Sequence, residues 1–265
     1  MDIGPGTRAL VTGASRGIGA ALAEALAARG ATVGLAARSE EELRARAERL
    51  PGRHHALPCD VGDRERVVAA VERFVSETGG LELAIANAGV ASYGPFAEQD
   101  PDEFERMTRI NWLGTVHTVS AVLPYMLERA KGHIVVVSSA SGLRTFPGAA
   151  VYGATKAAQR GFAEALRHEL SGSGVSLTLA FPGEMATHLH DHEKETLPGW
   201  YRGGDRAPPP TELAQRILSA VQRDRRHVHH PPIVRLLGAV HGVSPRVADL
   251  LLRRLRGASA APRAD

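Results

Sequence analysis

The chain has 265 residues, 43% of them hydrophobic, which is enough for the core of one α/β domain. It contains no apolar run of about eighteen residues, which excludes a transmembrane helix, and no signal-peptide pattern precedes the first apolar segment, so we expect a cytoplasmic protein. Cys59 is the only cysteine, which excludes an internal disulfide, and a net charge of +3 by itself argues neither for nor against nucleic acid.

Short apolar segments alternate with longer helical patterns along the chain. Strands that alternate with helices of ten or more residues form βαβ units with right-handed crossovers. The sequence therefore predicts an α/β fold, a single-domain Rossmann-type doubly wound parallel sheet with helices on both faces and ligands at the carboxyl ends of the strands. Strands are expected at residues 8–12, 32–37, 54–59, 83–86, 133–138 and 175–180, and helices at 19–29, 40–50, 64–78, 103–125 and over a segment that contains Tyr152 and ends near Leu170.

A glycine-rich turn joins the first expected strand to the first helix. It reads T-G-A-S-R-G-I-G from Thr12 to Gly19. Glycines let the backbone approach a pyrophosphate closely, and the free N–H groups and dipole of a helix N-terminus favour its negative charge. A tight turn that only needs positive φ is the alternative, but the position between strand and helix favours a nucleotide site.

The end of the second strand indicates which nucleotide binds. A site that prefers NAD usually has an acidic residue there, which holds the ribose 2′-hydroxyl. This chain has Ala37 and Arg38 instead, and Arg16 lies in the glycine turn. Two guanidinium groups suit the 2′-phosphate of NADP, so NADP(H) is favoured over NAD(H), although both arginines could simply be solvated.

Tyr152 and Lys156 are four residues apart, about one helical turn, so on a helix they share a face. An ammonium group beside a phenol favours the phenolate and lowers the pKa of the tyrosine. Such a tyrosine exchanges a proton with a carbonyl or carbinol oxygen. Taken alone, the pair is weak evidence, and an aromatic residue and a surface lysine on one helix are the favoured interpretation.

Several motifs in one order resemble the short-chain dehydrogenase/reductase family over about residues 7–187. They are the glycine turn, Asp60-Val61, Asn87-Ala88-Gly89, Asn111, Ser139 followed by Tyr152 and Lys156, and Pro182-Gly183 followed by Thr187. The thirteen-residue spacing to Tyr152 selects Ser139 rather than Ser138, which is then a cofactor-side or structural hydroxyl, with Ser141 a further alternative contact.

The resemblance implies roles for individual residues. Tyr152 is the general acid/base, Lys156 also hydrogen-bonds the nicotinamide ribose, Ser139 holds the substrate oxygen, and Asn111 helps a water chain to resupply the proton. Asp60 lies near the adenine amino group. The implied cofactor contacts are Gly13, Ser15, Arg16, Gly17, Ile18, Gly19, Arg38, Asp60, Val61, Asn87, Ala88, Gly89, Tyr152, Lys156, Pro182, Gly183 and Thr187.

The implied reaction is hydride transfer between the nicotinamide of NADP(H) and a carbonyl or secondary alcohol, without a metal. Residues at the positions that line the family's pocket suggest an apolar lipid-, acyl- or steroid-like substrate. A 3-oxoacyl thioester reductase is the rival enzyme, and a non-catalytic NADP-binding regulator is the rival from another class. The candidate pocket residues are Tyr93, Phe96, Leu143, Phe146, Met185 and Trp200.

The C-terminal part differs in charge from the rest. We expect a catalytic domain over residues 1–230, with a substrate loop at about 185–210, and a basic amphipathic extension over 231–265. Eight arginines and two acids lie between Arg223 and Arg256. Such a helix could lie on an anionic membrane, but packing on a partner subunit or over the chain's own pocket is favoured, and no nucleic-acid module accompanies the arginines.

Two further expectations concern histidines and assembly. The sets His188, His190, His192 and His227, His229, His230 lack a known metal-binding spacing, so we expect no metal there. The family resemblance implies a homodimer or homotetramer, formed through the helices near Asn111 and Tyr152.

Overall fold

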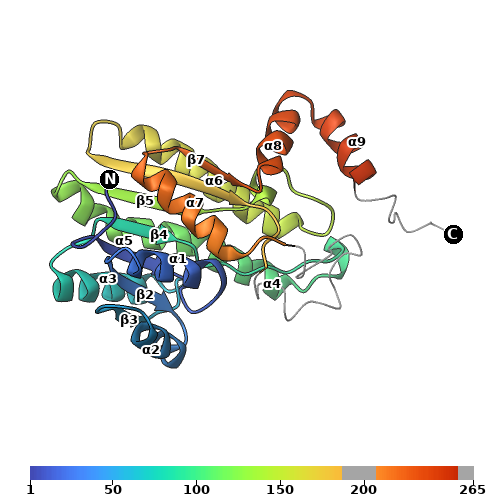
Figure 1. Cartoon of the computed structure of the whole chain (residues 1–265). Coiled ribbons are helices and arrows are strands. Elements are labelled where there is room, and N and C mark those ends of the chain that lie inside the picture. The colour runs from blue at the N-terminus through green and yellow to red at the C-terminus, as the bar shows by residue number, and fades with distance from the viewer. Residues whose placement is uncertain (187–206, 256–265) are drawn as a thin grey trace.

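The computed structural model of the protein describes residues 1–186 and 207–255, in which seven parallel strands form one sheet. The order is β3-β2-β1-β4-β5-β6-β7. The chain builds outward from β1 to β3 and then returns to place β4 on the other side of β1, which confirms the doubly wound Rossmann-type topology (Figure 1). The strands are β1 (Arg8–Thr12), β2 (Thr32–Ala37), β3 (His55–Pro58), β4 (Leu83–Ala86), β5 (Gly132–Val137), β6 (Val175–Pro182) and β7 (His227–His230).

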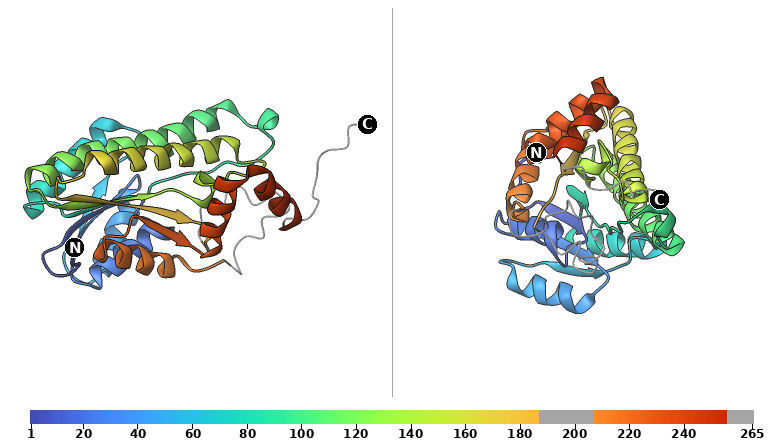
Figure 2. Two further views of the ribbon diagram at one scale, coloured as in Figure 1. Left: turned by 90° about the horizontal axis from the view of Figure 1, so that it is seen from above. Right: turned by 90° about the vertical axis from the view of Figure 1, so that its right-hand side faces the viewer.

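Helices cover both faces of the sheet (Figure 2). Successive strand residues point to opposite faces, so Val11 belongs to the core beneath α1 and α7, whereas Leu10 belongs to the core beneath α3, α5 and α6. The helices are α1 (Gly17–Ala27), α2 (Glu40–Arg49), α3 (Arg64–Thr78), α4 (Pro101–Met107), α5 (Gly114–Glu128), α6 (Ala150–Glu169), α7 (Pro210–Gln222), α8 (Ile233–Val243) and α9 (Pro245–Leu255).

The sequence did not predict β7 or α7. The β7 segment reads His-Val-His-His, with one apolar residue, and it pairs with β6 in the register Leu179↔His227 to Pro182↔His230. An edge strand of this composition forms because the backbone N–H and C=O groups of β6 are available for pairing. The hydrophobic pattern of the sequence does not show such pairing, so β7 was missed. The preceding α7 buries Leu213, Ile217 and Leu218 against the sheet.

The single helix expected over 103–125 is divided. A π-helical segment, Thr108–Leu113, separates α4 from α5. Such a segment adds a residue to one turn and is frequent at functional sites. No residue type in this stretch requires a π-helical turn, so the irregularity at Asn111 could not be predicted from the sequence.

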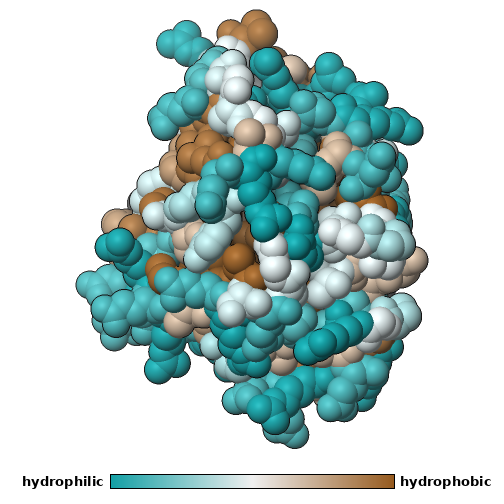
Figure 3. All heavy atoms as spheres, turned by 90° about the vertical axis from the view of Figure 1, so that its left-hand side faces the viewer, coloured by the Kyte–Doolittle hydropathy of each residue, from teal (hydrophilic) through white to brown (hydrophobic). Residues whose placement is uncertain are grey.

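The face of the molecule at the left of Figure 1 is mostly hydrophilic, and its apolar side chains lie in small groups separated by polar residues (Figure 3). The opposite side contains α8 and α9, which stand out from the body of the protein (Figure 1). Ile233–Val243 and Pro245–Leu255 of the expected C-terminal extension are therefore helical.

A buried histidine of β5 makes stability depend on pH. His133 is 1% exposed, its Nε2 lies 2.8 Å from Thr178 Oγ1, and burial lowers its pKa to about 4. Between pH 6.5 and 4 the unfolded chain binds a proton that the folded protein does not, so stability falls as the pH falls. We expect a loss of up to about 3 kcal/mol in urea unfolding over this range. His133→Gln, which does not titrate, should lose measurably less; equal pH dependence in both proteins would contradict the assignment.

Candidate active site

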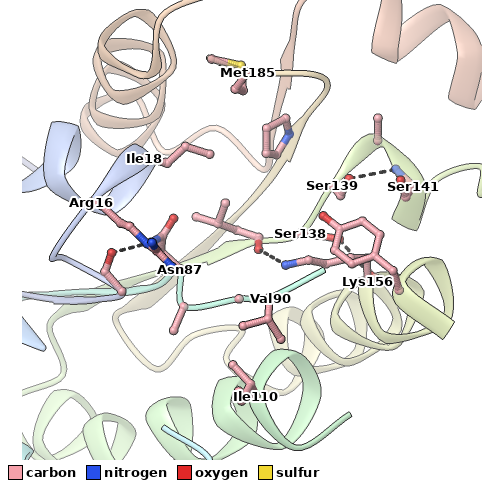
Figure 4. A pocket seen from close by; sticks show the side chains of 18 of the residues that line it. Arg16, Ile18, Asn87, Val90, Ile110, Ser138, Ser139, Ser141, Lys156 and Met185 are labelled. Atoms are coloured by element: carbon pink, nitrogen blue, oxygen red, sulfur yellow. Dashed lines mark hydrogen bonds between the residues drawn. The ribbon is translucent and has the colours of Figure 1, made fainter. Parts of the chain in front are cut away.

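A cavity of about 880 Å³ opens at the carboxyl ends of the strands, where the topology predicts a ligand site (Figure 4). Its wall includes Gly13 after β1, Asn87 after β4, Ser139 after β5 and Gly183 after β6. Of the described residues expected to contact the cofactor, all line this cavity except Gly19, the last residue of the glycine turn.

The glycine turn is held close to the end of β4. Gly13 and Gly17 have φ of 67° and 58°, which favour glycine, and a Cβ on Gly19 would lie 2.1 Å from the Gly13 carbonyl oxygen. Thr12 Oγ1 accepts hydrogen bonds from the backbone N–H groups of Asn87 (3.0 Å) and Ala88 (3.1 Å), and Asn87 Nδ2 donates to the Thr12 carbonyl oxygen (2.9 Å). These contacts fix a narrow backbone cradle of the kind that a pyrophosphate requires.

Arg46 is a supporting residue that the sequence did not reveal. From α2, its Nε and Nη2 donate to the Ser15 carbonyl oxygen at 3.1 and 2.9 Å, and its Nη1 pairs with Glu24 of α1 at 2.7 Å. The guanidinium therefore connects α2 to the glycine turn and to α1. The partners are 31 and 22 residues away in sequence, so no local pattern marks them.

The end of the cavity beyond the glycine turn is rich in charged residues. Arg16 and Arg38 are exposed, line the cavity, and have no side-chain hydrogen bond or ion pair within the described part of the chain. Glu42 of α2 lines the same end. Asp60 Oδ1 accepts from the Gly62 N–H at 2.9 Å, and its Oδ2 pairs with Arg109 at 3.3 Å, which orients the carboxylate.

Ser139, Tyr152 and Lys156 meet at the centre of the cavity. The first turns of α6 supply Tyr152 and Lys156, which are 6% and 4% exposed. Lys156 Nζ donates to the Val137 carbonyl oxygen at 3.2 Å and lies 5.9 Å from the centre of the Tyr152 ring. Ser139 Oγ accepts from the Ser141 N–H at 3.1 Å and is also hydrogen-bonded to Tyr152. Figure 4 shows the Lys156 side chain reaching into the cavity.

The structure corrects the expected electrostatics of this group. Burial raises the pKa of Tyr152 above its ordinary value, while hydrogen bonds from Ser139 and Tyr93 act in the opposite direction. Burial also lowers the pKa of Lys156 to about 8, because the ammonium has lost its solvent. Hydrogen bonds from Tyr93 and Ser139 therefore favour the phenolate, against the larger effect of burial.

Ser138, which lines the cavity, and Asn111, which does not, both stabilise the arrangement. Ser138 Oγ donates to the Lys156 carbonyl oxygen at 2.8 Å, which joins β5 to α6. Asn111 is fully buried in the π-helical segment; its Oδ1 accepts from the Val90 N–H at 2.8 Å, and its Nδ2 donates to the Val90 carbonyl oxygen and to Thr155 Oγ1. The π-helical turn thus lets one side chain connect the β4 loop with α6.

Comparison with known proteins agrees with this geometry. The family model described as short chain dehydrogenase matches residues 7–198. The chain belongs to the short-chain dehydrogenase family. It is therefore an oxidoreductase by family, with a Rossmann-type nucleotide-binding fold.

Individual members of the family show how far the similarity extends. A glycine betaine reductase of Emericella nidulans is 40% identical over 187 residues, which cover 69% of this chain and 15% of that protein. An uncharacterised oxidoreductase of Staphylococcus saprophyticus is 33% identical over 219 residues, which cover 81% of this chain and 91% of that protein. A short chain dehydrogenase/reductase from Burkholderia phymatum, solved with NAD, has a TM-score of 0.84 at 24% identity, covering 93% of this chain and 96% of that chain, and shows the shared fold.

The substrate end of this short-chain dehydrogenase is largely apolar. Tyr93, Phe146 and Met185 line the cavity, and the Tyr93 ring packs against Phe146 and Tyr152 with centroids 5.9 and 5.5 Å away. Leu143 does not line it, because it packs against Gly238 of α8. Phe96 is also outside; it is 63% exposed and stacks on Phe104.

The first residues of the C-terminal extension form one wall of the cavity. None of them was among the site residues predicted from the sequence. Pro231, Ile233, Val234 and Leu237 line the cavity, so α8 covers the chain's own pocket, one of the alternatives left open for this segment. Arg144 also lines the cavity and is ion-paired with Asp249 of α9. The apolar spacing of the extension was visible in the sequence, but its position over the cavity was not.

Some expectations fall on other parts of the chain. The residues outside the described ranges include Thr187, Trp200, His188, His190 and His192.

The histidines of β7 pack against an aromatic ring: His227 and His229 flank Phe181 at ring-centroid distances of 6.1 and 5.2 Å. No group of His, Cys, Asp and Glu that could hold a metal ion occurs among residues 1–186 and 207–250. No helix within the described ranges is long and apolar enough to cross a membrane.

Proposed function

We propose that this short-chain dehydrogenase is an NADP(H)-dependent oxidoreductase that transfers a hydride between nicotinamide and an apolar ketone or its secondary alcohol. The observation that carries the proposal is the meeting of Ser139, Tyr152 and Lys156 in one cavity with the glycine cradle. NADPH supplies the hydride when bound, and the protein's contribution is to position the substrate and to handle the proton.

Tyr152 and Ser139 act on the substrate oxygen. Their hydroxyls adjoin each other, so a carbonyl oxygen placed between them would accept a hydrogen bond from each in place of the one that they share. Ser139 stabilises the negative charge that develops on that oxygen, and Tyr152 transfers its proton to it. The raised pKa of Tyr152 suits the acid role in reduction, because the phenol stays protonated until the oxygen becomes basic.

Lys156 and Asn111 support proton supply and cofactor binding. Gly89 has no side chain, and the space beside it is bordered by Lys156 and Asn111. A Cβ on Gly89 would lie 3.4 Å from Lys156 Nζ and 3.3 Å from Asn111 Oδ1, so a small polar molecule has room between these two atoms. A water there would connect Asn111 to Lys156. Lys156, already directed into the cavity by the Val137 carbonyl oxygen, would bind the ribose hydroxyls of the cofactor.

The preference for NADP rests on the charged end of the cavity. Arg16 and Arg38 line it without side-chain partners among the described residues, and Ala37, rather than an acid, ends β2. The similar Burkholderia phymatum structure was solved with NAD, so the shared fold does not select the 2′-phosphate; the local arginines are the argument for NADP.

Arg38→Asp should reverse this preference. Replacing the guanidinium by a carboxylate removes a charge-assisted hydrogen bond and adds repulsion, so the Kd for NADP should rise by roughly 30-fold or more. The Kd for NAD should stay or fall, since an acid can accept from the 2′-hydroxyl. Fluorescence titration of both cofactors measures the two values, with Arg44→Asp as a control for net charge at an exposed residue outside the cavity. Equal wild-type affinities for both cofactors would contradict the argument.

The reaction is tested by following NADPH oxidation with a panel of apolar ketones, 3-oxoacyl thioesters and small polar ketones. The apolar cavity wall predicts turnover of the first group. Turnover restricted to the thioesters would assign the rival acyl reductase. NADPH binding without reduction of any member would contradict the proposed reaction and favour a regulator.

We also propose a cytoplasmic dimer or tetramer; a light-scattering mass near 28.2 kDa would contradict the oligomer.

A further inference from the structure

The outer face of α8 and α9 is apolar and exposed. Among the residues that the structure describes, eight large apolar side chains are exposed, and five of them belong to these two helices. On α8, the positions of Ile233, Leu236, Val240 and Val243 follow the spacing of one helix face. The exposed side chains are Ile233 (59%), Leu236 (58%), Val243 (88%), Val247 (48%) and Leu250 (51%).

The other face of α8 is already occupied by the protein. Val234 is 5% exposed, and Gly238 contacts Leu143, so this side is packed on the body of the molecule. The outer ends of the two helices project from the body of the molecule (Figure 1). Within the described residues, the exposed apolar stripe is therefore not used for packing.

The charges around the stripe are positive. Residues 231–255 contain four arginines and one acid, and Arg235 and Arg246 are exposed on the described helices. The acid, Asp249, is ion-paired with Arg144 of the body and so contributes no free negative charge. Arg253 and Arg254 follow at the end of α9. A second copy placed on this stripe by two-fold symmetry would bring these like charges together, which disfavours self-association through it.

We propose that α8 and α9 dock on an anionic lipid surface, with the apolar stripe among the acyl chains and the arginines at the headgroups. Amphipathic helices with cationic residues bind membrane interfaces in this way without crossing them. Ile233 is 59% exposed and also lines the cavity, so the docked surface adjoins the cavity wall. The docking itself does not depend on the proposed reaction, but it would place an apolar substrate dissolved in the bilayer beside the site.

The test is cosedimentation of the full chain with phosphatidylcholine vesicles, with and without phosphatidylglycerol, at low and high salt. We expect the wild type to bind only the anionic vesicles and to lose binding as salt rises. Arg235→Glu combined with Arg246→Glu should weaken binding by tenfold or more. Leu236→Asp combined with Val243→Asp should do the same, whereas Leu127→Asp, an exposed leucine on α5, should bind like the wild type.

None of the four substituted residues, Arg235, Leu236, Val243 and Arg246, lines the cavity, and an unchanged circular dichroism spectrum and thermal unfolding midpoint show that the variants are folded. A wild type that binds neither kind of vesicle would overturn the proposal. Equal binding to both vesicle types, unaffected by salt, would also overturn it, because the arginines would then play no part. A dimer that dissociates in Leu236→Asp/Val243→Asp, without vesicle binding, would assign the stripe to a second copy instead.

Discussion

Tyr152→Phe should reduce kcat for NADPH-dependent ketone reduction by roughly 1000-fold, because phenylalanine has no proton to transfer to the developing alkoxide. The ring itself is retained. It packs edge-on against Tyr93 with centroids 5.5 Å apart, and this contact does not need the hydroxyl. The Kd for NADPH and the thermal unfolding midpoint should therefore change little. Steady-state kinetics together with a cofactor titration separate loss of chemistry from loss of binding.

Tyr93→Phe is the matched control, since it removes a hydroxyl from the neighbouring ring in the same cavity. It should retain most of the turnover in reduction. In alcohol oxidation the phenolate of Tyr152 is the base, and the Tyr93 hydrogen bond lowers the pKa of that tyrosine. Removing the bond raises the pKa, so the rise of activity with pH should move to higher pH. If Tyr152→Phe kept wild-type kcat, or if both variants lost activity equally, Tyr152 would not be the proton donor.

The parts of this site that the sequence predicted are those fixed by local geometry. The glycine turn joins a strand to the helix that follows it, and Tyr152 and Lys156 are one helical turn apart, so spacing alone brings each group together. The alternation of strands and helices likewise predicted the parallel sheet and the edge at which the ligand lies. In these cases the residues that interact are close in the chain, or are placed by a general rule of topology.

The parts that the sequence did not predict depend on long-range contacts. Arg46 acts on Ser15 across a fold that brings α2 beside the glycine turn, and Tyr93 reaches Tyr152 from the loop after β4. Asn111 was identified as a residue of interest, but not the π-helical turn that lets it bind Val90 and Thr155 together. The pKa of Tyr152 could not be judged either, because burial, which has the largest effect on it, is a property of the assembled cavity.

Gly19→Ala should lower the affinity for NADPH by about 100-fold, equivalent to roughly 3 kcal/mol. The added Cβ would lie 2.1 Å from the carbonyl oxygen of Gly13, and that neighbour is backbone, so no side-chain rotation relieves the overlap. The glycine turn must move away from α1, which separates the N–H groups that form the cradle and strains the hydrogen bonds between Thr12 and Asn87. We also expect the free energy of unfolding to fall by about 1–3 kcal/mol, as for other overpacked sites.

Gly161→Ala provides the comparison for Gly19→Ala because it makes the same chemical change in a helix. Gly161 lies on the exposed side of α6, and a Cβ there has no neighbouring atom within 4 Å. Alanine is a better helix former than glycine by about 1 kcal/mol, so this variant should be slightly more stable and should bind NADPH like the wild type. Calorimetric titration and urea unfolding of both variants test the two effects separately. Wild-type affinity in Gly19→Ala would mean that the cofactor does not bind at this turn, since a pyrophosphate held by its N–H groups cannot tolerate the displacement that the methyl group imposes.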